Sequence, residues 1–438
     1  MPRTIFVGIA VAMSLLFFMS PILAQTSARD SELAEISSLE QQSREAFEAE
    51  KWVKVYVANL KLNQLRPGER DYVVNAVRAC GMLNRRSTAY HLMLEMQKEG
   101  MTFNFNKVPE TEQIRGTEAY EYINDLLVEA GKPAGVGTPV FTLQGNPADY
   151  AAIAWDSSRE KFLVGTKEKG EILAVSDTGE SEVLIGGSGK KGPGSVAGLA
   201  VDSEKNRLWV SGSDENRGVL VEFNLESLEP IGRYGLPADS SAHEIGSVTV
   251  SDNGTAYVID RETSTIYRKA AEGSQLEPFF SGPDLVDLTD LAVVGDDSRL
   301  FVADAARGVL VIDPLAEQAA FLSGPESLNL AGARGIEYQA GQLFVVQGAF
   351  KPQRVVRLAL DNVSGSIVES ISPMANALEV FNQPGIGTIR GNDLFYFANN
   401  GGEEGSGAIV VSTPLDAGTE VAPPDMDLYE EAIRSRSQ

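Results

Sequence analysis

The stretch that decides the fold reads LAVDSEKNRLWV at residues 199–210. A short apolar run ends in an aspartate, a polar turn follows, and a second run begins with leucine. Short β-branched and aromatic runs separated by turn residues are typical of antiparallel strands. The same phrase starts at five other places, residues 153, 248, 291, 336 and 387. The chain therefore carries six copies of one β-rich unit.

The spacing of these copies predicts their assembly. The intervals between their first residues are 46, 49, 43, 45 and 51, which leaves room for four strands in each copy. Units of this length that cannot bury a face alone indicate a six-bladed β-propeller, here over residues 139–415. The sixth copy lacks a fourth strand after residues 408–412. We expect residues 139–143 to fill that place and close the ring.

Before the propeller the apolar residues recur every three or four positions, which predicts helices. Residues 45–64 and 69–100 resemble tetratricopeptide-type helical hairpins, and residues 111–131 predict a capping helix. The sequence thus predicts a multidomain chain, with a tetratricopeptide-like helical domain at 30–131 followed by the propeller.

Both ends of the chain differ from these regions. Residues 1–24 combine one arginine, an apolar run, a proline and a final alanine, which is typical of a secretory signal peptide. Residues 416–438 form a polar tail. We expect an exported, periplasmic or secreted protein with no stable membrane insertion once the signal is cleaved.

The net charge and the small numbers of cysteine and histidine exclude several kinds of partner and site. The chain of 438 residues has a formal net charge of −24, which argues against nucleic acid as a partner. One cysteine and two histidines exclude an intramolecular disulfide and any multi-cysteine metal site. The acidic propeller leads us to expect cationic ligands near its channel.

Three repeat phrases, LAVDSEKNRLWV at 199–210, AYVID at 256–260 and LFVAD at 300–304, are similar to those of a known group of propellers. They resemble the superfamily of SMP-30/gluconolactonase, strictosidine-synthase-like and NHL propellers, over about residues 145–412. The segment 345–358 is further similar to exported bacterial SMP-30-like proteins with helical hairpins before the propeller. The resemblance implies a six-bladed propeller with a ligand or metal site in its channel.

Calcium-dependent lactonases of this superfamily hold their metal with one Glu, one Asp and two Asn from the innermost strands. Two matching positions here are Gly246 and Thr289, so the ligand set is degenerate. Four residues before the repeat phrase stand Asp149, Glu244 and Asp287, which could hold Ca²⁺ or another divalent cation at one mouth of the channel. The alternative is that these acids cap turns or face solvent.

Three other side chains are candidates near that mouth. His243 and Glu244 form the only His and carboxylate pair in the propeller sequence and are candidates for acid–base catalysis. Asp290 and Arg334 are candidates for binding a ligand. For His243, the alternative is a loop histidine that only forms hydrogen bonds.

Two function classes follow. The first is a binding or scaffolding role for an exported propeller, with a small molecule or a protein as partner. The second is a divalent-metal-dependent hydrolase of lactonase type, which would use Asp149, Glu244 and Asp287.

Overall fold

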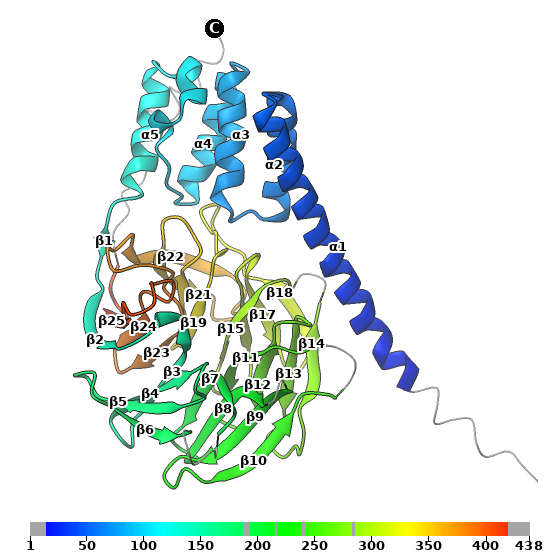
Figure 1. Ribbon diagram of the computed structural model, residues 1–438, viewed down its shortest axis with the longest axis vertical. Helices are drawn as coiled ribbons and strands as arrows, with labels where there is room; N and C mark the ends of the chain where they lie inside the picture. The colour runs from blue at the N-terminus through cyan, green and yellow to red at the C-terminus, as the bar shows by residue number, and fades with distance from the viewer. Residues whose placement is uncertain (1–14, 187–191, 215–216, 239–241, 283–284, 419–438) are drawn as a thin grey trace, which may run out of the picture.

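A computed structural model describes residues 15–186, 192–214, 217–238, 242–282 and 285–418 of the chain. Figure 1 shows two regions, a stack of helices and a ring of β-sheets below it. The helices are followed by a six-bladed β-propeller, as the sequence predicts.

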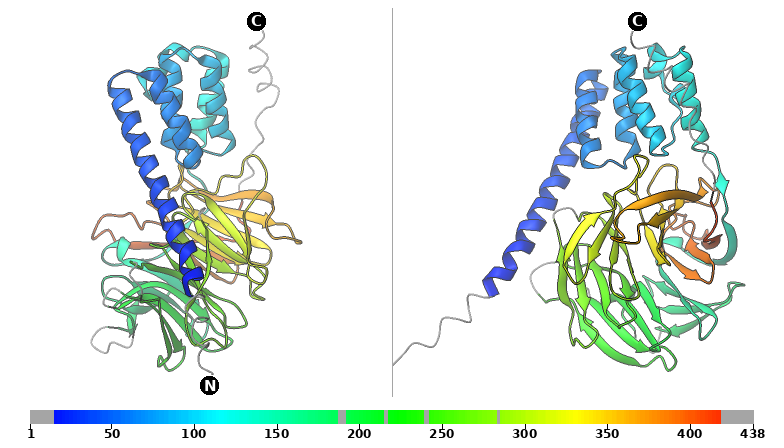
Figure 2. Two further views of the ribbon diagram at one scale, coloured as in Figure 1. Left: turned by 90° about the vertical axis from the view of Figure 1, so that its right-hand side faces the viewer. Right: turned by 180° about the vertical axis from the view of Figure 1, so that it is seen from behind.

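The helical region consists of two antiparallel hairpins and a fifth helix, each packed against the next in the chain. Its elements are α1 (Leu15–Glu48), α2 (Trp52–Leu65), α3 (Arg70–Met82), α4 (Arg86–Lys98), η1 (Phe105–Lys107), η2 (Pro109–Ile114) and α5 (Glu118–Glu129). The first hairpin starts earlier than predicted: its first helix, α1, begins before Ala24, the last residue of the predicted signal peptide. Figure 2 shows that α1 runs past one side of the propeller. The capping helix begins later than predicted, since Thr117 accepts a hydrogen bond from Tyr120 N and so fixes its start.

The first three blades are four-stranded antiparallel sheets. Their strands are β3 (Tyr150–Asp156), β4 (Lys161–Thr166), β5 (Ile172–Val175), β6 (Ser181–Ile185); β7 (Ser195–Asp202), β8 (Arg207–Asp214), β9 (Arg217–Asn224), β10 (Pro230–Gly235); and β11 (Ile245–Val250), β12 (Ala256–Asp260), β13 (Thr265–Lys269), β14 (Glu277–Ser281).

The last three blades take in two strands from before the ring. Their strands are β15 (Leu288–Val293), β16 (Leu300–Asp304), β17 (Gly308–Asp313), β18 (Gln318–Phe321); β19 (Gly335–Gln339), β20 (Gln342–Gln347), β21 (Arg354–Leu360), β22 (Val368–Asn376) with β1 (Ala134–Gly135); and β23 (Gly387–Arg390), β24 (Asp393–Phe397), β25 (Ala408–Pro414) with β2 (Thr138–Leu143). A short helix, η3 (Pro147–Asp149), precedes β3.

The ring closes as predicted. All six repeat phrases begin in the innermost strands β3, β7, β11, β15, β19 and β23, and each of these strands contacts the next, with β23 returning to β3. In the sixth blade β2 pairs antiparallel with β25, so a strand from before the ring completes its last sheet. Phe141 and Leu143 of β2 are buried there.

Adjacent blades are joined by side-chain hydrogen bonds as well as by apolar packing. Ser211 Oγ donates to Gly246 O at 2.5 Å, and Thr289 Oγ1 donates to Ala333 O at 3.0 Å. Each bond satisfies a buried polar group across a blade boundary and so fixes the position of one blade against the next.

The helical region is packed against the fourth and fifth blades. Phe350, from the loop after β20, is buried in the core of the helices with Met101 and Phe105. Arg354 lies 4.0 Å from the Phe350 ring and donates to Glu99 O at 3.2 Å. These contacts hold the helices beside one mouth of the channel.

The ends of the chain are only partly described. Residues 1–14 of the predicted signal peptide and residues 419–438 of the predicted tail lie outside the described residues. No helix among the described residues is long and apolar enough to cross a membrane.

Candidate functional site

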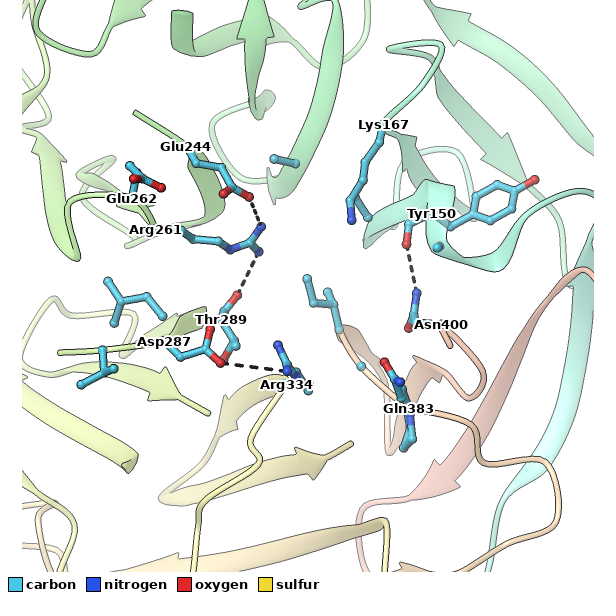
Figure 3. A pocket seen from close by; sticks show the side chains of 18 residues that line it. Tyr150, Lys167, Glu244, Arg261, Glu262, Asp287, Thr289, Arg334, Gln383 and Asn400 are labelled. Atoms are coloured by element: carbon cyan, nitrogen blue, oxygen red, sulfur yellow. Dashed lines mark hydrogen bonds and ion pairs between the residues drawn. The ribbon is translucent and has the colours of Figure 1, made fainter. Parts of the chain in front are cut away.

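A cavity of about 540 Å³ opens at the mouth of the channel where the innermost strands begin. Its wall consists of residues before and at the starts of these strands and residues after the second strands of blades 1, 3 and 6, because antiparallel neighbours bring those two ends together. Figure 3 looks at this cavity, which we call the mouth cavity.

The repeat register locates part of the lining of the mouth cavity. Five of the six residues two places before the phrases line it, namely Ala151, Ala197, Thr289, Arg334 and Gly385. Four places before the phrases, Glu244, Asp287 and Gln383 also line it. The predicted candidates Glu244, Asp287 and Arg334 are therefore brought together.

Three cationic side chains reach the cavity from three different blades. Lys167 follows β4, Arg261 follows β12, and Arg334 precedes β19. Their cationic ends point toward the opening between the blades (Figure 3). Three carboxylates, Glu244, Glu262 and Asp287, line the same cavity, so the expectation of cationic ligands stays a prediction.

Two of the three cations have acidic neighbours. Arg261 Nη1 lies 3.6 Å from Glu244 Oε1, and Arg334 Nη2 lies 4.0 Å from Asp287 Oδ2. Both contacts are long for charge-assisted hydrogen bonds and are partly exposed. Arg261 Nη2 also donates to Thr289 O at 3.5 Å.

Lys167 differs from the two arginines. Among the described residues its ammonium has no hydrogen bond or ion pair. Loss of hydration and the nearby Arg261 lower the pKa of Lys167, against the opposing effects of Glu244 and Asp149. A cation that is held near another cation without a direct counter-ion favours an anion in the cavity.

Two amide side chains complete the polar lining. Asn400 donates to Tyr150 O at 3.2 Å, whereas its buried Oδ1 has no hydrogen-bond partner among the described residues. Gln383 points into the opening in Figure 3. The cavity thus offers an unused acceptor and further amide groups beside its cations.

Asp149 does not line the mouth cavity. Its Oδ1 accepts a hydrogen bond from Glu168 N at 2.6 Å in the loop after β4. Within the described ranges no group of three or more His, Cys, Asp or Glu could hold a metal ion. The predicted divalent-cation site of Asp149, Glu244 and Asp287 stays a prediction.

His243 is held away from the mouth cavity. Its Nδ1 lies 2.6 Å from Asp260 Oδ2, and Thr263 Oγ1 donates to the same oxygen at 2.6 Å. Asp260 Oδ1 also accepts from Glu244 N at 2.9 Å. The imidazole therefore contacts a carboxylate that holds the loops around it.

Asp290 lies deeper in the channel, apart from Arg334. It lines a second cavity of about 340 Å³ formed by all six innermost strands. Ser247 Oγ donates to its Oδ1 at 2.5 Å and Ile336 N donates to its Oδ2 at 2.9 Å. Burial raises the pKa of Asp290 to about 6, and it raises that of the neighbouring Glu337 as well. Asp290 thus links the third, fourth and fifth blades. The position of a residue along its own strand does not reveal such contacts between blades.

Sequence reasoning missed Lys167 and Arg261. Both follow directly on the second strand of a blade, after Thr166 and Asp260. In an antiparallel hairpin the end of the second strand lies beside the start of the first, so these positions face the same mouth. Reading the residue after each second strand would have found both.

The comparisons with known proteins concern the fold. No protein-family model and no curated protein sequence matches the chain. Similar solved structures include luciferin-regenerating enzyme (TM-score 0.46, 13% identity, covering 65% of this chain and 97% of that chain). They also include the gluconolactonase XC5397 from Xanthomonas campestris (TM-score 0.44, 12% identity, 65% and 90%) and virginiamycin B lyase from Staphylococcus aureus (TM-score 0.43, 14% identity, 61% and 82%). These likenesses describe the architecture alone.

Proposed function

We propose that the protein binds a small ligand bearing one carboxylate in the mouth cavity. The observation that carries the proposal is the convergence of Lys167, Arg261 and Arg334 on one opening. A carboxylate there would accept hydrogen bonds from preorganised cationic donors, which are among the strongest in proteins.

The local charge balance disfavours a highly charged anion. Glu244, Glu262 and Asp287 line the same cavity as the three cations, so the formal charges of the lining cancel. A more highly charged anion would be repelled by these carboxylates. Asn400 Oδ1 would accept an N–H or O–H from the uncharged part of the ligand.

The binding role extends the first of the two functions expected from the sequence, and we propose it for an exported protein on the basis of residues 1–24. A hydrolase of lactonase type stays the alternative, since Glu244 and Asp287 line one cavity. That alternative requires turnover of a lactone with added Ca²⁺ that is lost in Glu244→Gln.

The proposal is tested by calorimetric titration with N-acetylalanine, a small monocarboxylate. We expect Lys167→Gln and Arg334→Gln each to weaken binding about tenfold, because each removes a charge-assisted hydrogen bond. Lys167→Arg should retain binding and extend it to higher pH, since a guanidinium stays protonated where the lowered pKa of Lys167 lets the ammonium deprotonate.

The matched control is Lys169→Gln, two residues along the same loop and outside the cavity. It removes the same charge and should leave the affinity within about twofold. Equal losses in the Lys167 and Lys169 variants, or no binding by the unaltered protein, would contradict the proposal.

A further inference from the structure

A third cavity, of about 380 Å³, adjoins the mouth cavity at the junction of the two regions, and we call it the junction crevice. The mouth cavity and the junction crevice share Val286, Asp287 and Arg334 in their linings. A ligand held at Arg334 could therefore continue into the crevice without leaving the protein surface.

The two walls of the crevice come from different regions. The helical wall contains residues at the α2–α3 turn and a residue of α1, namely Leu33, Arg66, Gly68, Glu69 and Tyr72. The propeller wall is made of small residues, Ala305, Ala306, Ala331, Gly332 and Ala349. A lining of alanine and glycine leaves the backbone of the loops accessible to a ligand.

The position of the helical wall is fixed by close contact. A Cβ atom on Gly68 would stand 1.9 Å from Ala331 Cβ, so only glycine permits this approach. Arg307 Nη1 donates to Leu65 O at 3.1 Å, and its Nη2 donates to Glu32 at 2.6 Å. The crevice is thus built by the docking of the two regions.

The helical wall carries unused polar capacity. Arg66 Nη1 is buried and has no hydrogen-bond partner among the described residues, while Arg66 Nη2 lies 3.8 Å from Glu32 Oε1. A buried donor without a partner destabilises the structure around it. A ligand oxygen entering the crevice could satisfy it after a small movement of the side chain. Loss of hydration also raises the pKa of Glu69 on the same wall.

We propose that the junction crevice binds the backbone of an extended peptide whose terminal carboxylate lies in the mouth cavity. This inference rests on the proposed function. The terminal carboxylate of the peptide accepts hydrogen bonds from Lys167 and Arg334. The peptide backbone then lies along the alanine and glycine wall, and one of its carbonyl oxygens contacts Arg66. Backbone carbonyl and amide groups suit the alanine and glycine wall, because these small side chains leave room beside the backbone of the loops.

The test is a length series titrated by calorimetry. N-acetylalanine is the shortest probe, and N-acetylated alanine peptides of two to six residues with a free carboxylate are the longer ones. We expect the affinity of the full-length protein to rise about tenfold or more along the series and then level off, as each added hydrogen bond contributes until the crevice is full. A flat series would overturn the inference, and so would tighter binding of uncharged oligosaccharides than of the peptides.

Two variants localise the effect. Ala349→Leu fills the crevice and Arg66→Gln removes its donor, so both should abolish the gain with length while N-acetylalanine binds as before. Ala319→Leu, on the exposed outer strand β18, is the control and should change neither. If the gain with length survives both crevice variants, the crevice is not the peptide site. If N-acetylalanine itself fails to bind, the proposed function fails first.

Discussion

At the scale of single residues, Asp290 shows how one carboxylate ties blades together. It accepts hydrogen bonds from Ser247 of the third blade and Ile336 of the fifth, and burial raises its pKa from 3.8 to about 6. An acid whose pKa is higher in the folded state binds more protons when folded. Its ionisation therefore lowers the free energy of unfolding as the pH rises from about 4 to above 6.

We expect Ser247→Ala to lower the free energy of unfolding by about 1–3 kcal/mol, because it removes a donor to a buried carboxylate. The loss should be larger above the Asp290 pKa of about 6 than near pH 4, since the ionised form depends most on the hydroxyl. Urea unfolding at both pH values measures it. Ser181→Ala, exposed on β6, should cost under about 0.5 kcal/mol, and an equal loss at the two pH values would refute the pH argument.

At the scale of elements, β2 closes the ring by pairing with β25. We expect Phe141→Ala to cost about 3–5 kcal/mol, because the ring is buried between the sixth and first blades and its loss leaves a cavity. Thr142→Ala, on the exposed face of the same strand, should cost under about 1 kcal/mol. Thermal unfolding of both variants checks this, and equal midpoints would mean that β2 adds little to closure.

The repeat phrase predicted the strands of the propeller well, because the same strand pattern recurs at a nearly constant interval along the chain. Six phrases located six inner strands, and the missing last strand pointed to residues 139–143. The same register located Glu244, Asp287 and Arg334 at one mouth. It could not place Lys167 or Asp290, because their surroundings come from neighbouring strands and blades that are distant in the sequence.

At the scale of the whole molecule, the helices and the propeller share one packed junction. Phe350 leaves the propeller and is buried among helical residues such as Val77 and Met101. We expect Phe350→Ala to cost about 3–5 kcal/mol and to loosen the helices from the propeller. Limited proteolysis should then cut between α5 and β2 faster than in the unaltered protein. Unchanged cleavage would show that other contacts hold the junction.

The same junction gives the molecule its continuous path from the channel mouth to the helices. Arg334 belongs to both cavities, so a change there should affect short and long ligands alike. Changes at the helical wall should affect long ligands only. This separation distinguishes the role of the propeller from that of the helical region.

The central claim is that the channel mouth recognises a carboxylate. The most direct measurement compares the affinity of N-acetylalanine with that of its uncharged N-methylamide, in the unaltered protein and in the Lys167→Gln, Arg334→Gln double variant. We predict that the carboxylate binds at least about tenfold more tightly to the unaltered protein and that the double variant no longer distinguishes the two. Equal affinities in the unaltered protein, or discrimination that persists in the double variant, would contradict the claim.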